Sequence, residues 1–162
     1  MPAGDVHLID DALVAFVRGP VSMFLATTDA TGTPDATRVV GIAPIDDHRL
    51  RVLIPRAAEA ARTNAIVGAR LALLVTDITT YRSVMWKGRV ESAGDPRSPG
   101  DSALIDRHVS SFSAASALVG IDPDVAWRFF DTDGIPLVIV VDEMFDQTPG
   151  PNAGRRLNGS PT

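Results

Sequence analysis

Three arginines lie within or beside apolar segments, where a charged side chain is uncommon. Arg38 interrupts an apolar run, Arg56 follows a strand-like segment, and Arg62 precedes the hydroxyl of Thr63. Guanidinium groups on neighbouring elements, together with a hydroxyl and the N–H groups of a helix N-terminus, can bind a dianionic phosphate. The pattern therefore indicates a phosphate site if these segments converge. Pairing of each arginine with a surface carboxylate is the alternative, and the residues alone leave both open.

Other catalytic chemistries lack their characteristic residues. The sequence has no cysteine, which removes thiolate catalysis, disulfides and cysteine-ligated metals together. It contains no GxGxxG, P-loop, HExxH or nucleophile-elbow pattern. Because His7, His48 and His108 do not have the spacing of a metal pair, we expect three surface histidines and no metal site. Asp46-Asp47 is expected to form a turn and not a catalytic pair of carboxylates.

Size and charge limit the class of protein further. At 162 residues and 17.2 kDa, with 45% hydrophobic residues, the chain has material for one domain with a full core. A net charge of -5 argues against nucleic-acid binding, which needs a basic surface. The first 11 residues lack the basic and apolar parts of a signal peptide, and no run of about 18 apolar residues occurs. We therefore predict a cytoplasmic protein with no membrane or nucleic-acid partner.

Turn signals separate apolar segments that have the alternation or β-branched content of strands. Six strands are expected, over residues 21–28, 35–45, 49–55, 70–76, 81–93 and 136–141. Helices are expected from Asp10-Asp11 to the stop at Gly19-Pro20, within residues 57–69 before Gly68, and twice between 98 and 130. Hairpin-linked strands with helices between them favour an antiparallel α+β sheet or barrel over a doubly wound parallel sheet.

The predicted domain covers residues 1–146 and is followed by a Pro/Gly-rich tail over 147–162. The composition of the tail, taken alone, favours disorder. An arm laid on a partner subunit is the alternative.

Two segments carry a resemblance to a known family. The first is Phe24-Leu25-Ala26-Thr27-Thr28-Asp29, continued through Gly32, Pro34 and Arg38-Val39-Val40, and the second is residues 81–91, Tyr-Arg-Ser-Val-Met-Trp-Lys-Gly-Arg-Val-Glu. In order and spacing they resemble the pyridoxamine 5′-phosphate oxidase-related family of FMN-binding split β-barrels. The match covers about residues 21–91, and residues 145–151 are similar to the endings of family members.

The resemblance implies an α+β fold with a six-stranded antiparallel split β-barrel and flanking helices. It also implies a homodimer with two FMN molecules in clefts between the subunits. Carried over position by position, Arg38 would hold the flavin phosphate, and Val39 and Val40 would run beside the isoalloxazine ring. Ile54 and Pro55 would line the same cleft.

Other parts of the family's site fall on departures from its pattern. The family places a basic residue and a hydroxyl at the start of the next helix, where direct alignment with this sequence gives alanine. If the alignment is shifted by one residue, Arg62 and Thr63 take these roles. Ser83 stands where the vitamin B6 oxidases carry a glutamine that reaches the flavin. Residues 147–153 are expected to pack near the partner's cleft. The family's substrate-binding arginine–histidine motif has no counterpart in residues 146–162, which argues against vitamin B6 oxidase activity.

The resulting hypothesis is an FMN-dependent oxidoreductase of unknown substrate, with a nicotinamide or another small molecule as its reaction partner. A second hypothesis keeps the fold and replaces FMN by the deazaflavin F420. A third is a binding module that holds flavin or haem without turnover.

Overall fold

A computed structural model describes residues 8–94 and 96–157, so His7 lies outside the described residues. Within them, seven strands form one antiparallel sheet in the order β2-β1-β5-β6-β7-β4-β3. Their bounds are β1 Val21–Thr28, β2 Pro34–Arg38, β3 Gly41–Pro44, β4 Arg49–Pro55, β5 Arg70–Asp77, β6 Ser83–Ala93 and β7 Gly134–Asp146. The predicted antiparallel α+β class is confirmed.

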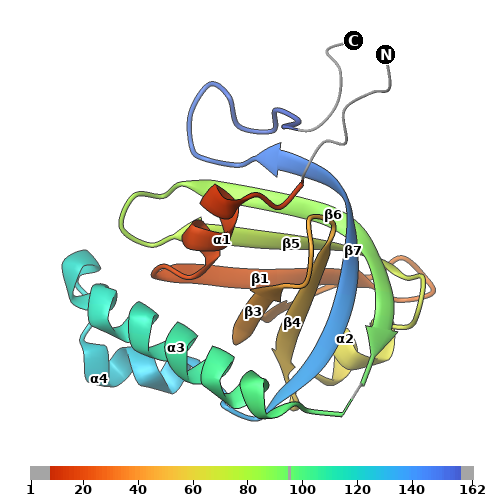
Figure 1. Cartoon of the computed structure of the whole chain (residues 1–162), viewed down its shortest axis with the longest axis horizontal. Helices are drawn as coiled ribbons and strands as arrows, with labels where there is room; N and C mark the ends of the chain where they lie inside the picture. The colour runs from red at the N-terminus through yellow and green to blue at the C-terminus, as the bar shows by residue number, and fades with distance from the viewer. Residues whose placement is uncertain (1–7, 95, 158–162) are drawn as a thin grey trace.

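The sheet curls because its two edge strands follow each other directly in the chain. β2 and β3 lie at opposite edges of the sheet order, yet only Val39 and Val40 connect them. The Val39 N–H donates to Met23 O on β1 (2.9 Å), and the Val40 N–H donates to Leu53 O on β4 (2.8 Å). These two hydrogen bonds continue the pairing of each edge strand up to the corner, so the edges must meet in a barrel-like curl (Figure 1).

The prediction of six strands is therefore wrong by one. The expected strand over residues 35–45 is two strands, because its first half pairs with β1 and its second half pairs with β4. Continuous apolar character cannot show such a change of partner, since both halves have the composition of a strand.

The two faces of the sheet are unlike. Along β1 the side chains of Val21, Met23 and Leu25 are fully buried inside the curl, whereas Phe24 on the other face is 39% exposed. This is the alternation that strand geometry imposes. The buried face packs into the main core together with β4, β5 and β6, and Trp86 is the largest side chain in it.

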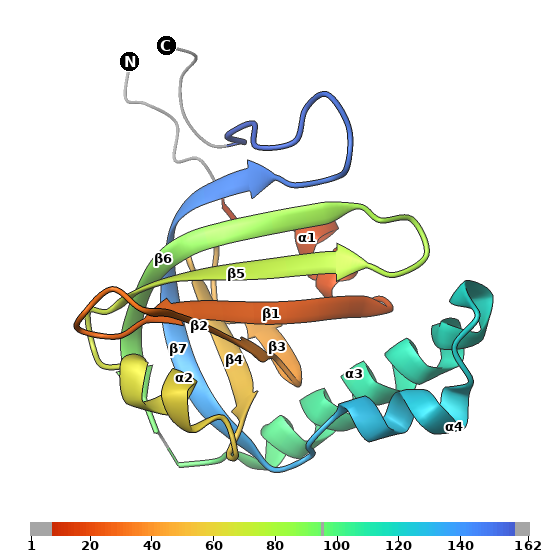
Figure 2. The same ribbon diagram turned by 180° about the vertical axis from the view of Figure 1, so that it is seen from behind.

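The helices cover only part of the sheet (Figure 2). They are α1 Asp11–Val17, α2 Glu59–Asn64, α3 Pro99–Ser116, η1 Ala117–Val119, α4 Pro123–Ala126 and η2 Trp127–Phe129. A second core lies where α3, α4 and η2 meet the sheet, and it consists of Val40, Leu53, Ile105, Val109, Phe112, Ala126 and Phe130.

The helix predicted over residues 57–69 is shorter than expected. It ends at Asn64, because the chain after it returns to the sheet: the Gly68 N–H donates to Val90 O, and the Val90 N–H donates to Ala69 O. Strand pairing with β6 therefore overrides the helix propensity of this alanine-rich segment.

An ion pair fixes α3 to the sheet. Arg51 of β4 donates from Nε and Nη2 to the two carboxylate oxygens of Asp101, both at 2.7 Å. Asp101 is fully buried and also accepts from the Ser98 N–H, which caps the helix. The Arg51 guanidinium is the main reason that the pKa of Asp101 is held below its usual value. This bidentate pair anchors α3 on the sheet, and it thereby helps to determine where the aromatic side chains of α3 lie.

Gly88 tests the packing of β6 against β7. The register shifts between Lys87 and Gly88, and a Cβ atom at Gly88 would overlap with the carbonyl oxygen of Val140. We expect Gly88→Ala to lower the free energy of unfolding by about 1–3 kcal/mol or more, measured by urea denaturation. Gly100→Ala is the control, because the nearest atom to its Cβ would be Ser98 Oγ at 3.7 Å, and it should be neutral or stabilising. Equal stability of the two variants would contradict this packing.

Candidate functional site

The open face of the sheet carries aligned apolar side chains. Phe24 of β1 is paired with Leu74 of β5, which is paired with Met85 of β6. Directly paired residues project to the same face, so the three side chains form a row across the strands. All three keep some exposure to solvent, in contrast to the fully buried row on the other face. An apolar surface of this kind marks a site for a ligand or a partner.

A hollow of about 420 Å³ opens on this face, within the size range of small-molecule sites. The connection after β5 and the η1 region form its walls beside the strands. No charged side chain lines it; the lining residues are Ser22, Phe24, Leu74, Thr76, Ile78, Tyr81, Val119 and Ile121. Tyr81 is 62% exposed and adopts a φ of 60°, the left-handed region that residues other than glycine rarely adopt. The hollow therefore offers apolar walls and hydroxyl groups.

Arg38 contacts Ser22 and Phe24, two of the residues that line this hollow. It is paired opposite Phe24, and its guanidinium carbon is 4.9 Å from the centre of that ring. The rings of Phe130 and Phe129 lie at 5.4 and 5.9 Å. Nη1 also donates to Ser22 Oγ over a long 3.5 Å. Arg38 is thus a cation held between aromatic rings, at the start of the open face.

No carboxylate among residues 8–94 and 96–157 forms an ion pair with Arg38. Its side chain is half-buried, and this burial lowers its pKa. The guanidinium nevertheless stays protonated at neutral pH. Arg56, by contrast, donates from Nε to Asp133 Oδ2 at 2.7 Å. The carboxylate alternative therefore describes Arg56 but not Arg38, which leaves Arg38 able to take an external anion.

His108 of α3 packs on the same aromatic ring as Arg38, that of Phe130. The prediction that His108 is a surface residue is wrong. It is 6% exposed, and its ring packs at 89° against Phe130, with the centroids 5.2 Å apart. Burial, and secondarily the charge of Arg38, lowers its pKa to about 4, so the imidazole is neutral at pH 7. The loose apolar spacing of α3 hid this position, because a buried histidine is indistinguishable from a surface one in such a pattern.

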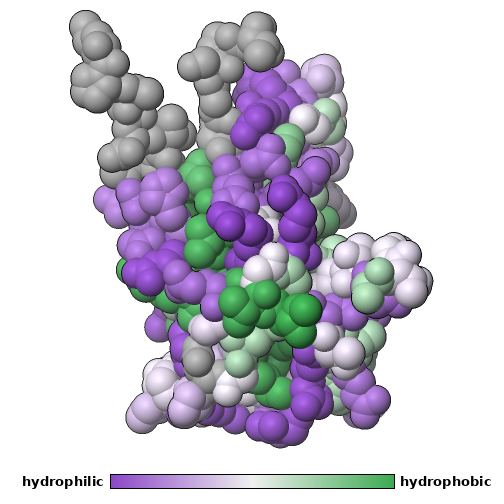
Figure 3. Space-filling view, turned by 90° about the vertical axis from the view of Figure 1, so that its right-hand side faces the viewer, coloured by the Kyte–Doolittle hydropathy of each residue, from purple (hydrophilic) through white to green (hydrophobic). Residues whose placement is uncertain are grey.

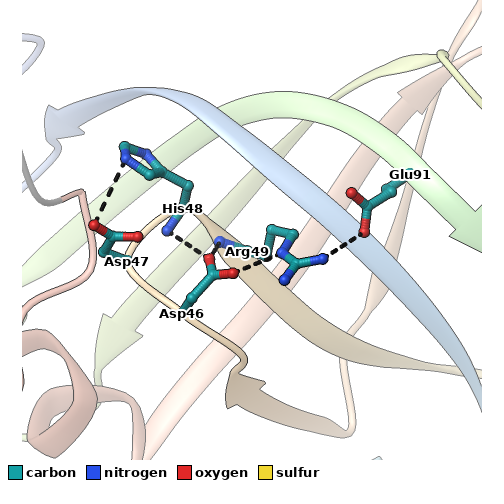
Figure 4. A network of polar contacts seen from close by, with 5 residues as sticks. All are labelled: Asp46, Asp47, His48, Arg49 and Glu91. Atoms are coloured by element: carbon teal, nitrogen blue, oxygen red, sulfur yellow. Dashed lines mark hydrogen bonds and ion pairs between the residues drawn. The ribbon is translucent and has the colours of Figure 1, made fainter.

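His48 lies at the tip of an exposed turn (Figure 4). Asp46 accepts from the main-chain N–H groups of His48 and Arg49 and from Arg49 Nε at 2.7 Å, and Arg49 also reaches Glu91 at 3.4 Å. Asp47 lies 3.8 Å from the His48 imidazole. Asp46-Asp47 is thus part of a turn, as predicted. In the part of the chain that the structure describes, no cluster of three metal-ligating side chains occurs.

Comparison with known families gives a match over most of the chain. Residues 9–127 fit the model of the family described as pyridoxamine 5′-phosphate oxidase. The chain belongs to this family. The family predicted from residues 21–91 is therefore confirmed over a longer stretch.

Solved structures agree with the fold of the pyridoxamine 5′-phosphate oxidase family. HupZ of Group A Streptococcus has a TM-score of 0.56 at 16% identity, over 90% of this chain and 99% of that one. An F420 reductase has a TM-score of 0.52 at 20% identity, over 80% and 93%. At these identities the likeness concerns the fold alone. No curated protein matches the chain. Among the described residues, no helix has the length and apolarity to cross a membrane.

Four positions that the family resemblance assigns to the cofactor lie at the barrel corner or beside it. Val39 and Ile54 belong to the main core and Val40 to the second core, and all three are fully buried. Pro55, at the end of β4, is half-buried. Since the three aliphatic side chains point into the cores, a ligand could approach them only at the main chain. Their assigned role beside the ring stays a prediction.

Arg62 and Thr63 belong to α2, which packs beside β1 and β2. They line a hollow of about 460 Å³ with the ends of β6 and β7, and Arg62 donates from Nη1 to Arg56 O at 3.0 Å. This side of the molecule, which carries α2, shows apolar surface bordered by polar surface (Figure 3). Ile66 and Val67, in the connection after α2, are 66% and 72% exposed. No hydrogen bond or ion pair among the described residues joins Arg62 or Thr63 to Arg38, although α2 packs against β2. Their expected convergence on one phosphate stays a prediction.

Ser83 lies on the same face of the sheet as the hollow, but its polar groups already have hydrogen-bond partners. Its Oγ donates to Tyr81 O at 2.9 Å and lies 2.9 Å from Thr76 Oγ1. Its main-chain N–H donates to Thr148 Oγ1, and its carbonyl accepts from the Gln147 N–H. The first part of the tail is therefore hydrogen-bonded to β6 in its own chain. Its expected position near a partner's cleft stays a prediction.

The aromatic surroundings of Arg38 were not predicted. The hairpin of β1 and β2 could have shown that Arg38 lies opposite Phe24, since the turn residues between the strands define the register. Phe129 and Phe130 carried no comparable signal. They reach Arg38 only because the segment after α4 packs against the end of β2.

The buried imidazole of His108 predicts a pH dependence of stability. In the unfolded chain it gains a proton below about its ordinary value of 6.5, whereas in the folded chain it stays neutral down to about 4. The unfolded state therefore binds more protons in this window, and stability falls as pH drops from 6.5 towards 4, by up to about 3 kcal/mol.

Urea denaturation of the wild type and of His108→Gln between pH 4.5 and 7.5 measures this contribution. The variant should show a flatter profile than the wild type, since other groups contribute equally to both. Parallel profiles would contradict the burial of a neutral imidazole.

Proposed function

We propose that this protein binds a phosphate-bearing flavin, FMN in the first place, with the phosphate on Arg38 and the ring system against the open face of β1, β5 and β6. The observation that carries the proposal is the half-buried Arg38, which has no carboxylate partner among the described residues and contacts two residues that line an uncharged hollow. Desolvation of a guanidinium is unfavourable, and an anionic ligand would offset it with charge-assisted hydrogen bonds.

The residues around the hollow fit a flavin ring. Phe24, Leu74 and Tyr81 provide apolar and aromatic surface, as planar ligands require. The hydroxyls of Ser22 and Thr76 lie among them and can hydrogen-bond to the polar edge of such a ring. Ser22 also touches Arg38, so the polar groups lead from the phosphate end into the hollow.

One chain supplies only part of such a site. Arg38 is a single guanidinium, and no hydrogen bond or ion pair among the described residues links Arg62 or Thr63 to it, so a second copy would supply further phosphate contacts. The open row through Phe24 and the exposed Leu118 and Tyr81 beside it are apolar enough to be covered in an oligomer. These features support a homodimer in which a second copy closes the cleft.

A bound flavin would supply the transfer of a hydride or of single electrons. The chain's own residues would bind the phosphate, orient the ring and exclude water from it. We propose a flavin-dependent oxidoreductase that accepts a nicotinamide or another small molecule as reaction partner. Tyr81 carries the one titratable side chain among the described residues that line the hollow, so the flavin's own electronics would govern the chemistry.

F420 is the second candidate. Its phosphate is a diester with a single negative charge, which one guanidinium matches better than it matches a dianion. The fold is shared with an F420 reductase, although the identity of 20% supports the fold only.

Arg38→Ala tests the site. Loss of a charge-assisted contact to phosphate should weaken FMN binding by about ten- to a hundredfold, or 1.5–3 kcal/mol, measured by quenching of flavin fluorescence. The control is Arg49→Ala, which removes the same charge from the exposed turn and should change the FMN affinity less than twofold. F420 is titrated in parallel. An unchanged FMN and F420 affinity in Arg38→Ala would rule out Arg38 as the phosphate ligand.

A further inference from the structure

His108 contains a buried polar atom for which the described residues provide no hydrogen-bond partner. Among the residues that the structure describes, two buried side-chain polar atoms have no hydrogen-bond partner: His108 Nε2 and Ser113 Oγ. Leaving such a group unpaired is costly, so natural structures usually give it a partner or a function. The position of His108 next to the anion-accepting Arg38 suggests what that function is.

Phe130 joins the two groups. The guanidinium carbon of Arg38 lies 5.4 Å from the centre of this ring, and the imidazole of His108 lies 5.2 Å from the same centre. The two polar groups thus pack on one aromatic side chain, with β2 contributing one and α3 the other. At this separation the positive charge of Arg38 disfavours protonation of the His108 imidazole.

All other charged groups that the structure places beside His108 are also cations. Arg18, at the C-terminus of α1, and Arg107 of α3 line a small hollow with His108, and its remaining lining residues, Val17, Ile42 and Leu104, are apolar. No carboxylate lines this hollow. An additional positive charge on His108 is therefore unfavourable unless an anion arrives.

We propose that His108 is the second polar group of the Arg38 anion site and takes up a proton when an anion occupies Arg38. This inference rests on the proposed function for the site itself. A phosphate on Arg38 neutralises the charge that disfavours an imidazolium, and the free Nε2 position can then carry a proton as a donor towards the anion.

Linkage gives the direction of the effect. If anion binding favours the protonated imidazole, lower pH must favour anion binding in equal measure. FMN would therefore bind the wild type more tightly at pH 5 than at pH 8, beyond any change due to its own phosphate. The ratio of affinities between wild type and His108→Gln removes the contribution of the ligand, since both proteins meet the same FMN.

Imidazole NMR reports the proposed event at its own atoms. The chain has three histidines, so His108 is assigned by comparison with His108→Gln. The titration of each imidazole is recorded between pH 3.5 and 8, without ligand, with saturating FMN, and with sulfate, whose charge is constant over this range. We expect both ligands to move the His108 midpoint up by about one pH unit or more, with His48 unchanged as the internal control.

The affinity ratio should follow. Between pH 8 and pH 5, FMN binding to the wild type should strengthen about twofold or more relative to His108→Gln. Arg38→Lys, which keeps a charge, should retain a smaller shift of the His108 midpoint, whereas Arg38→Ala should raise the midpoint of the free protein and abolish its response to ligand.

The outcomes separate the two proposals. Saturation with FMN that leaves the His108 midpoint unchanged would overturn this inference and leave the flavin site standing. Failure of FMN to bind would contradict the flavin site, and the sulfate titration would then decide the inference alone: a shift that Arg38→Ala abolishes supports an anion site with a proton-coupled histidine, and no shift refutes it.

Discussion

The two-residue connection between β2 and β3 is the constraint on which the rest of the structure depends. Because those strands are the two edges of the sheet, a link as short as Val39-Val40 brings the edges together and curls the sheet. It also divides the interior: Val39 belongs to the main core inside the curl, and Val40 belongs to the second core with residues of α3 and α4. The residue just before the link, Arg38, is thereby held on the open face, between β1 and the aromatic residues of the second core.

The position of Arg38 combines two opposing effects. Burial against three aromatic rings removes water from a permanent charge, while the faces of those rings return part of the lost solvation. The bidentate pair of Arg51 and Asp101 keeps α3 in place, and through α3 it positions His108 beside Phe130. The cation is thus preorganised for an anion, and the flavin hypothesis explains why its counter-charge is absent from the described chain.

The sequence predicts the parts of the fold whose pattern is local. β1 and β4 have the predicted bounds, because turn residues flank them and their apolar positions alternate. The predicted strand over residues 136–141 is shorter than β7, since the continuous apolar run ends at Val141. The continuation over residues 142–146 is recognisable only from its pairing with β6. The corner at residues 39–40 was missed for the same reason: a change of pairing partner is a property of the closed sheet.

The site was less predictable than the fold. The importance of Arg38 followed from a charge in an apolar run and from the family resemblance. The hydrogen bond of Arg62 to the Arg56 carbonyl and the burial of His108 depend on how α2 and α3 dock on the sheet, which residue spacing does not encode. The open face was equally hidden, because an exposed apolar strand face and a buried one have the same alternation.

Native mass spectrometry of the purified protein, after incubation with FMN and separately with F420, tests the central claim most directly. The account predicts a species of twice the chain mass that carries bound flavin, and loss of the flavin from Arg38→Ala with the dimer retained. A monomer that binds neither cofactor, or flavin bound equally well without Arg38, would contradict it.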